Sequence, residues 1–226
     1  MKNYLKLTVI FLLLSVTSHS AKAQYYQIAN QMTGMLSNAF SGSVNYKGFV
    51  DLSYEKGLGN RQVDFVGLST SQGFKYRDWF FMGVGIGVDI AMSHTNSDFG
   101  PGYNSGYGDY WNHGYKTTGV MVPLFTDFRF NLGNKAHTSF FIDAKIGASF
   151  LMGNNYLAVA DGFITNREYF YLKPSAGVRI PLGSNRKSAV NIGVTYQLLT
   201  SNYWYNSPSS YNVTLSSLGA TVGFEW

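Results

Sequence analysis

The residues best suited to chemistry lie in the stretch 93–116, which contains two histidines and two aspartates, His94, Asp98, Asp109 and His113. Such groups bind metal ions or form a hydrolytic Asp–His pair. Their spacing matches no recognised zinc pattern, and Gly, Asn and Tyr are abundant in the stretch. We therefore expect solvated loop residues here and predict no catalytic residue, no metal site and no cofactor.

A glycine motif at 83–87 could suggest a nucleotide-binding loop. A dinucleotide fingerprint needs its third glycine three residues after the second and a helix after that. Here Gly83, Gly85 and Gly87 recur every second residue, and Val88 occupies the next position. Residues at this spacing share one face of a strand. The motif therefore predicts small residues that leave space inside a narrow barrel.

The composition is unusual for a soluble domain, because only 13% of the residues are charged while 17% are aromatic. Soluble domains carry about 25% charged residues. After residue 20 the sequence has no apolar run of the roughly 18 residues that a membrane helix needs. The apolar atoms must therefore be distributed in another pattern, and alternation along strands is the obvious candidate.

Alternating apolar and polar residues form eight segments from residue 44 onward, each near the ten or so residues that a tilted membrane strand requires. The clearest segment is 80–91, where Val84, Ile86 and Ile90 alternate with Gly85 and Asp89. The other segments fall in 44–55, 62–71, 118–131, 140–150, 170–180, 190–198 and 218–226. The pattern predicts an all-β fold, a transmembrane antiparallel up-and-down β-barrel over 44–226, with eight strands favoured over ten.

The polar face of these segments consists mainly of Gly, Ser, Thr and Asn with isolated charges. A water-exposed face would carry more charge, about 25–35% of its residues, so we assign this face to the interior and the apolar face to lipid. A soluble barrel with an apolar core is the alternative. The predicted interior charges are Lys47, Asp51, Asp89, Asp127, Arg129, Asp143, Lys145, Lys173, Arg179 and Glu225. An unpaired buried charge costs several kcal/mol, so these groups must pair and plug the barrel, or else line a narrow pore.

The predicted connections alternate mostly between short and long ones. Those at 57–61, 132–138 and 181–187 are short, the one at 72–79 is intermediate, and those at 92–117, 151–166 and 199–211 are long. With both ends of the barrel segment in the periplasm, the long connections lie outside the cell, as is usual for outer-membrane barrels, although the first outer loop is short. Aromatic residues near the strand ends, such as Trp79 and Phe140 on the periplasmic side and Tyr169 and Tyr196 on the outer side, predict two interfacial belts.

Residues 1–23 have the pattern of a cleaved signal peptide. Lys2 and Lys6 precede a short apolar core at 7–16, and Ala21 and Ala23 form a small-x-small cleavage site. Without the three lysines of this segment, 14 basic and 12 acidic residues remain, so we expect no nucleic-acid partner. The following segment, 24–43, has apolar residues at three- and four-residue spacings, which predict either a short amphipathic helix at the periplasmic mouth or a simple leader into the first strand.

The sequence resembles the small outer-membrane β-barrel family of Bacteroidetes, in the manner of OmpX and the OmpA barrel. The likeness lies in the export segment, in strand–turn units such as 128–133 and 178–183, and in the aromatic end of the chain. It covers about 44–226 and implies a final strand that the barrel-assembly machinery recognises. Gly219, Val222, Phe224 and Trp226 would form that assembly signal, although Thr221 departs from the motif when it is aligned on the last residue.

The resemblance implies a bacterial outer-membrane location, with outer-membrane lipid and lipopolysaccharide as partners. Function should then reside in the outer loops, because loops on rigid scaffolds carry binding. Aromatic residues gather in two of them, namely Tyr103, Tyr107, Tyr110, Trp111, Tyr115, Tyr203, Trp204 and Tyr205. We expect a non-enzymatic structural or surface-interaction role, with a glycan or protein as ligand. A narrow porin-like pore for ions or small solutes is the main alternative, and a barrel hydrolase acting on lipid or peptide comes third.

Overall fold

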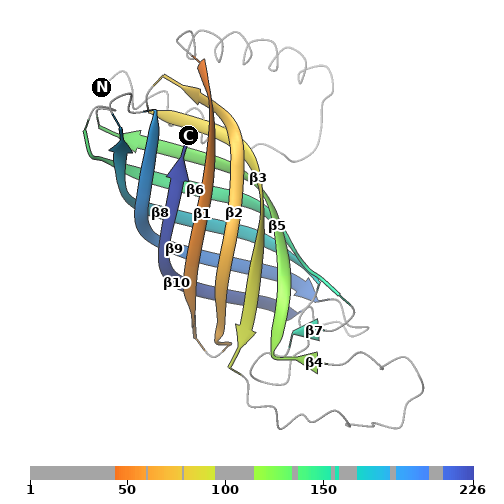
Figure 1. Cartoon of the computed structure of the whole chain (residues 1–226). Coiled ribbons are helices and arrows are strands. Elements are labelled where there is room, and N and C mark those ends of the chain that lie inside the picture. Colours follow the sequence, from red (N-terminus) through yellow and green to blue (C-terminus); the bar gives the residue numbers. More distant parts are fainter. Residues whose placement is uncertain are drawn as a thin grey trace, which may run out of the picture. The chain divides into compact units, whose positions relative to one another are not determined.

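The computed structural model describes residues 44–59, 61–77, 79–94, 115–133, 137–153, 156–157, 167–183, 187–203 and 211–226. Eight strands form a closed antiparallel barrel (Figure 1), which confirms the predicted fold class. The strands are β1 (Val44–Leu58), β2 (Val63–Tyr76), β3 (Phe80–Ser93), β5 (Thr118–Leu132), β6 (Ser139–Leu151), β8 (Glu168–Leu182), β9 (Ser188–Tyr203) and β10 (Tyr211–Glu225). The predicted signal peptide and the segment 24–43 lie outside the described residues, and within the described ranges no helix is long and apolar enough to cross a membrane.

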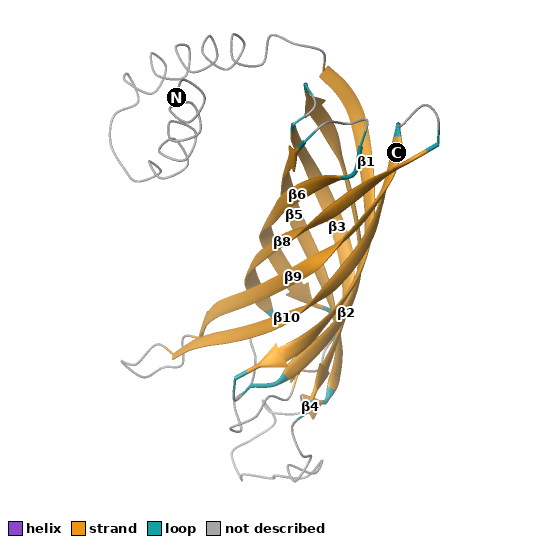
Figure 2. Cartoon of the chain, turned by 90° about the vertical axis from the view of Figure 1, so that its left-hand side faces the viewer, coloured by secondary structure: helices purple, strands orange, loops and turns teal. Residues whose placement is uncertain are grey.

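The two ends of the barrel differ in their connections. At the short-turn end, which also holds Trp226, the connections are 77–79, 133–138 and 183–187. At the opposite, long-loop end, the residues after β3, β6 and β9 span more of the chain, and two short strands, β4 (Tyr115–Lys116) and β7 (Tyr156–Leu157), pair in parallel there (Figures 1 and 2). Each of the eight barrel strands pairs with the barrel strand that follows it in the chain, and β1 pairs with β10 to close the barrel.

Three strands, β2, β9 and β10, extend into segments that the sequence pattern predicted as connections. The structure continues β2 to Tyr76, so the connection to β3 is 77–79 and not 72–79. It also continues β9 to Tyr203 and begins β10 at Tyr211, within the predicted connection 199–211. In β2 the difference arises because Gln72 and Lys75 are polar and therefore resemble loop residues in the sequence. In the structure they belong to the strand and pair with Val84 and Phe81 of β3.

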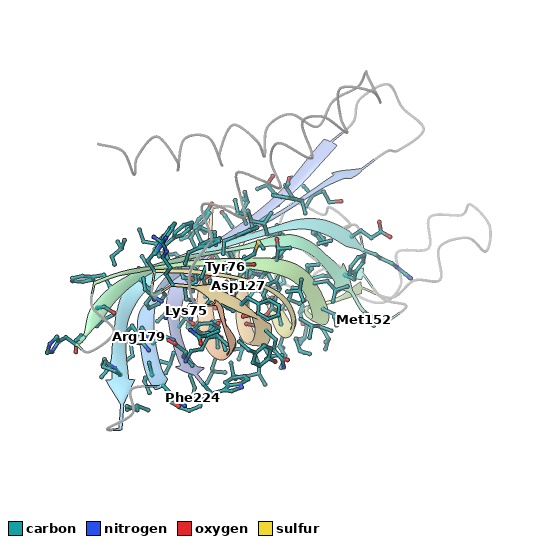
Figure 3. All side chains as sticks on the ribbon, turned by 90° about the horizontal axis from the view of Figure 1, so that it is seen from above. Lys75, Tyr76, Asp127, Met152, Arg179 and Phe224 are labelled. Atoms are coloured by element: carbon teal, nitrogen blue, oxygen red, sulfur yellow. The ribbon has the colours of Figure 1, made fainter. Side chains whose placement is uncertain are left out.

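The distribution of apolar and charged side chains is the inverse of that in a water-soluble protein. Large apolar residues face outward, with exposed fractions of 68% for Val84, 67% for Phe140 and 62% for Val194. Charged residues such as Asp51, Glu55 and Arg129 face the interior and are at most 5% exposed. Seen from above, Lys75, Asp127 and Arg179 lie within the ring of strands and Phe224 lies outside it (Figure 3). The polar face of the alternating segments is therefore the inner face.

The closure between β1 and β10 depends on a glycine. Gly48 and Trp226 exchange two backbone hydrogen bonds, with N···O distances of 3.3 and 3.1 Å. The Trp226 ring lies directly over Gly48, where a Cβ atom would come within 2.3 Å of the ring. Trp226 also stacks on Phe224, with ring centroids 6.3 Å apart. The Trp226 ring thus covers a strand position that has no side chain, as aromatic residues do over glycines in other sheets.

Candidate functional site

The interior of the barrel contains all ten charged residues predicted from the sequence. Nine of them are buried, and the side chain of Lys47, at the short-turn end, is 14% exposed. The structure adds two interior charges that were not among them, Glu55 and Lys75, both of which are buried. Lys75 was missed because the sequence pattern placed it in a connection. Among the described residues, these interior groups are six cations and six carboxylates, so their formal charges sum to zero.

A central cluster joins three carboxylates to two cations. Lys145 Nζ lies 2.7 Å from Asp51 Oδ2, and Arg129 Nη2 lies 3.2 Å from the same oxygen and 3.0 Å from Asp143 Oδ2. Asp127 completes the cluster and accepts a hydrogen bond from Ser71. These residues come from β1, β2, β5 and β6, so the ion pairs cross the interior and not only neighbouring strands. Buried pairs of this kind fix the relative positions of the strands that carry them.

Glycines opposite two carboxylates make room for them. Gly223 is the ladder partner of Asp51, and a Cβ atom on it would come within 2.0 Å of Asp51 Oδ1. Gly67 is the partner of Asp89, and a Cβ atom there would come within 2.4 Å of Asp89 Oδ1. Outside the central cluster, Lys173 lies 2.6 Å from Glu55 and donates to Ser53 at 2.8 Å. At Gly67 and Gly223 the absence of a side chain therefore provides the space that a buried carboxylate occupies.

A second cluster, the mouth cluster, lies at the short-turn end and consists of Lys47, Lys75, Arg179 and Glu225. Arg179 binds Glu225 through two nitrogens, with Nε–Oε2 and Nη2–Oε1 distances of 2.6 and 3.2 Å. Lys47 and Lys75 lie 3.2 and 3.6 Å from Glu225 Oε1. One carboxylate thus faces three cations.

Aromatic rings separate the two clusters. The guanidinium carbon of Arg129 lies 4.0 Å from the ring centre of Phe49 and 5.2 Å from that of Phe141. Phe49 packs edge-on against Phe81, which is the ladder neighbour of both Arg129 and Lys75. All three rings are at most 1% exposed. They form a layer that shields the ion pairs of the central cluster from the mouth.

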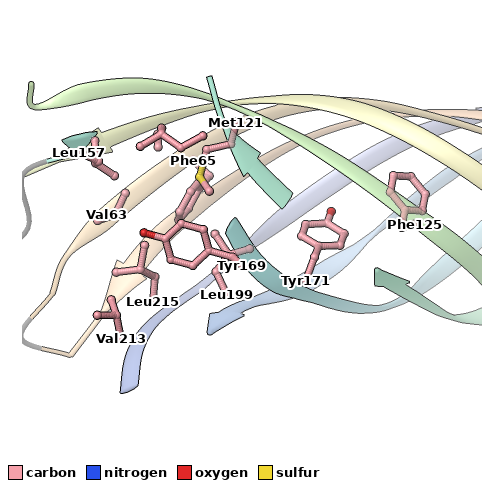
Figure 4. Packing of buried hydrophobic residues seen from close by; sticks show 12 residues of the cluster. Val63, Phe65, Met121, Phe125, Leu157, Tyr169, Tyr171, Leu199, Val213 and Leu215 are labelled. Carbon is pink, nitrogen blue, oxygen red and sulfur yellow. The ribbon is translucent and has the colours of Figure 1, made fainter. Parts of the chain in front are cut away.

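The long-loop half of the interior is filled by apolar side chains. This apolar cluster comprises Val63, Phe65, Ala91, Met121, Phe125, Leu151, Leu157, Tyr169, Tyr171, Leu199, Val213 and Leu215 (Figure 4). The sequence pattern did not predict it, and Tyr169, which was expected in an outer aromatic belt, is 3% exposed and part of the cluster. Leu157 belongs to β7, so a residue from a long connection is buried in this cluster.

One histidine of the stretch 93–116 has a defined partner, which is a residue of β2. His94 Nε2 lies 2.8 Å from Asp64 Oδ2. The same carboxylate accepts hydrogen bonds from Tyr54 Oη at 3.2 Å and from the Gly57 backbone N–H at 2.8 Å. Asp64 therefore ties the β1–β2 turn to the end of β3. The pair was not predicted because its members are 30 residues apart in the sequence. Asp98, Asp109 and His113 lie outside the described residues.

The aromatic residues predicted to bind a ligand in the outer loops lie mostly outside the described residues. Tyr103, Tyr107, Tyr110, Trp111, Trp204 and Tyr205 lie outside the described residues, and for Tyr115 and Tyr203 only the backbone is described, in β4 and β9. The residues of the predicted assembly signal lie in or directly after β10. Val222, Phe224 and Trp226 face outward, and Gly219 packs against the backbone of Tyr54 and Glu55.

Comparisons with known proteins give structural similarities alone. No protein-family model and no curated protein matches the chain. The solved structures include Neisserial surface protein A (NspA), with 10% identity, a TM-score of 0.48, and coverage of 80% of this chain and 97% of that one. They also include the outer membrane enzyme PagL, with 12% identity, a TM-score of 0.46, and coverage of 77% and 97%. The N-terminal β-barrel domain of Pseudomonas aeruginosa OprF has 12% identity, a TM-score of 0.40, and coverage of 81% and 100%. At these values the similarities assign neither an activity nor a ligand.

Proposed function

We propose that this chain is a bacterial outer-membrane protein whose sealed barrel presents its long loops at the cell surface. The observation that carries the proposal is the distribution of side chains, apolar outside and ion-paired inside. In water, the outward Val84, Ile86 and Val88, each at least 49% exposed, would form part of a large apolar surface. In a bilayer the same surface is the ordinary lipid-facing band of a β-barrel.

The closed strand order supports a membrane location independently. Every barrel strand pairs on both sides, so the backbone offers no open sheet edge. Only helices and closed barrels satisfy their backbone polar groups in hydrocarbon. With the short-turn end in the periplasm, the long connections lie outside the cell, as is usual in this class.

A sealed interior supports a role in envelope structure or surface interaction over the alternative of a narrow pore. Two obstacles lie in series along the barrel, the central cluster and the apolar cluster, and Phe65, Met121 and Tyr171 are at most 1% exposed within the second. An eight-stranded barrel has little interior space beyond its side chains. The proposed function is non-catalytic, and its ligand is a glycan or protein recognised by the aromatic loops.

The test is a surface-binding assay on a Gram-negative host that expresses the full chain and a variant lacking residues 100–115. Both proteins should appear in the outer-membrane fraction with heat-modifiable electrophoretic mobility, and the complete protein should be cut by protease added to intact cells. Binding of a glycan or protein array to the cells should be lost with the deletion. Recovery in the soluble fraction would contradict the membrane assignment, and unchanged binding would contradict the role of the loop.

A further inference from the structure

The turn between β2 and β3 contains an arginine in a backbone conformation that favours glycine. Arg77 has a φ of 51° and is the one non-glycine residue with a positive φ in the part of the chain that the structure describes. The first residues after β5 and β8, which begin the other two short connections, are Gly133 and Gly183, with φ values of 139° and 69°. A left-handed conformation is unfavourable for a residue with a Cβ atom. Arg77 therefore lowers the stability of the turn, and its side chain is expected to have a use elsewhere.

The aromatic residues beside Arg77 form a platform on the outer face of the barrel. Tyr76, Phe80 and Phe130 are successive ladder partners across β2, β3 and β5, with ring centroids 6.0 and 5.0 Å apart. Trp79 lies against Phe80 and Phe130, at centroid distances of 5.5 and 6.0 Å, and is 39% exposed. These four residues, the aromatic platform, lie at the short-turn ends of their strands.

The position of the platform sets the position of Arg77 relative to a bilayer. The backbone N–H of Asn131 donates to the carbonyl of Trp79, with an N···O distance of 2.7 Å, so β5 holds the end of the turn in place. Trp and Tyr side chains concentrate at the level of the lipid headgroups, where one end of the ring is apolar and the other is wet. Arg77 lies in the same turn and is exposed, so its guanidinium is at the level of the lipid phosphates.

The connections at the short-turn end carry an excess of positive charge. In the sequence the three short connections contain one carboxylate, Asp78, against the four cations Arg77, Lys135, Arg186 and Lys187. The structure describes Arg77 and Lys187, and both are exposed. Exposed side chains at a rim can meet a flat anionic surface directly, and each Lys or Arg near such a surface adds to the attraction.

We propose that Arg77 and the aromatic platform bind the headgroup of an anionic phospholipid in the leaflet at the short-turn end. The proposal rests on the membrane location proposed above. The guanidinium donates to the lipid phosphate, a pairing for which arginine is well suited. The exposed Trp79 ring packs beside the glycerol region of the same lipid. An anionic lipid is favoured over a zwitterionic one because the positive rim repels an ammonium headgroup.

Quenching of Trp79 fluorescence by brominated lipids tests the proposal at the site itself. The full chain carrying Trp111→Phe, Trp204→Phe and Trp226→Phe is reconstituted into vesicles of phosphatidylcholine and phosphatidylglycerol in equal amounts. Bromine is placed on one lipid or on the other, so that the two quenching levels report which lipid lies beside Trp79. Phosphatidylglycerol should be favoured by about fivefold, the size expected for one cation at an anionic surface.

Two substitutions of Arg77 separate lipid binding from a structural role. Arg77→Gly should bring the lipid ratio close to one, whereas Arg77→Lys should keep most of the preference because it keeps the charge. Urea denaturation of the same proteins gives the second readout. Since glycine tolerates the positive φ, Arg77→Gly should unfold at a urea concentration no lower than that of the parent chain. A lower midpoint would overturn the proposal, because Arg77 would then be present for the stability of the turn.

The matched control is Trp226, which lies at the same end of the barrel and is also 39% exposed. In a chain carrying Trp79→Phe, Trp111→Phe and Trp204→Phe, adding Arg77→Gly should leave the lipid ratio at Trp226 unchanged. An equal loss of preference at Trp226 would overturn the local site, because it would indicate general attraction by the charge of the rim. Equal quenching of Trp79 by both brominated lipids in the parent chain would overturn it as well. Failure of the chain to enter vesicles at all would contradict the membrane location and, with it, this site.

Discussion

At the scale of single residues, Asp51 is the carboxylate that holds both cations of the central cluster. Replacing Asp51 with Asn keeps its volume but leaves Arg129 and Lys145 facing a neutral group. Removing one partner of a buried ion pair costs about 3–5 kcal/mol, so the free energy of unfolding of D51N in lipid vesicles should fall by about that amount. Urea denaturation followed by tryptophan fluorescence measures it.

The matched control is Asp127→Asn in the same cluster. Asp127 accepts a hydrogen bond from Ser71, a neutral group, and an asparagine oxygen can accept that bond too. We expect its cost to be less than half that of Asp51→Asn. Equal costs would mean that burial of charge in general, and not the two contacts of Asp51, governs stability.

Gly48 and Trp226 form a second residue-scale contact that mutation can test. A Cβ atom on Gly48 would lie 2.3 Å from the Trp226 ring, so Gly48→Ala must displace the ring. Overpacking costs about 1–3 kcal/mol, and we expect a loss of unfolding free energy near the lower value. In a Trp226→Ala background the same change should cost nothing, because the ring is gone. If the double-mutant cycle gave no coupling energy, the contribution of the Trp226 ring to stability would not depend on the glycine at position 48.

At the scale of elements, the free-energy cost of placing a charge on the outward face of a strand should depend on its depth in the bilayer. Val84 lies near the middle of β3 and is 68% exposed, so Val84→Arg should cost about 2–4 kcal/mol in a bilayer. Leu58 is the last residue of β1 and is 42% exposed, so Leu58→Arg should cost about 0–1 kcal/mol. Unfolding in vesicles compares the two, and a Val84→Arg variant as stable as Leu58→Arg would argue against a membrane-embedded face.

The strands were predictable from the sequence where alternation is strict, as in β3 and β6. The prediction failed where both faces of a strand are polar, as in the second half of β2, because Gln72 and Lys75 then resemble a loop. The apolar cluster was missed for the opposite reason. Phe65, Phe125 and Tyr171 face inward, and an inward aromatic residue cannot be distinguished from an outward one by residue type. Only the closed register of the sheet determines which way they point.

The candidate sites, like the strands, were predictable from the sequence only in part. Ten of the twelve interior charges among the described residues could be predicted one by one, because each stands alone on the polar face of its strand. Their grouping into a central and a mouth cluster could not, because it joins residues as distant as Lys47 and Glu225. The pair of Asp64 and His94 likewise depends on the neighbouring ends of β2 and β3.

At the scale of the whole molecule, we infer from the buried charges and the apolar cluster that the barrel is closed along its axis. Water and ions entering from the short-turn end meet the aromatic layer and then the central cluster. From the other end they meet the apolar cluster with Leu157 above it. Opening a path would require breaking several buried ion pairs and separating packed rings, at a cost far above thermal energy.

Single-channel recording in a planar bilayer tests this central claim most directly. The full chain, purified from host membranes, is inserted into the bilayer, and insertion is verified by heat-modifiable mobility and protease protection of the recovered protein. The account predicts a silent membrane, with no reproducible conductance step across the applied voltage range. Steady openings of a fixed size would contradict it, because they would require a continuous water path through the central cluster and the apolar cluster.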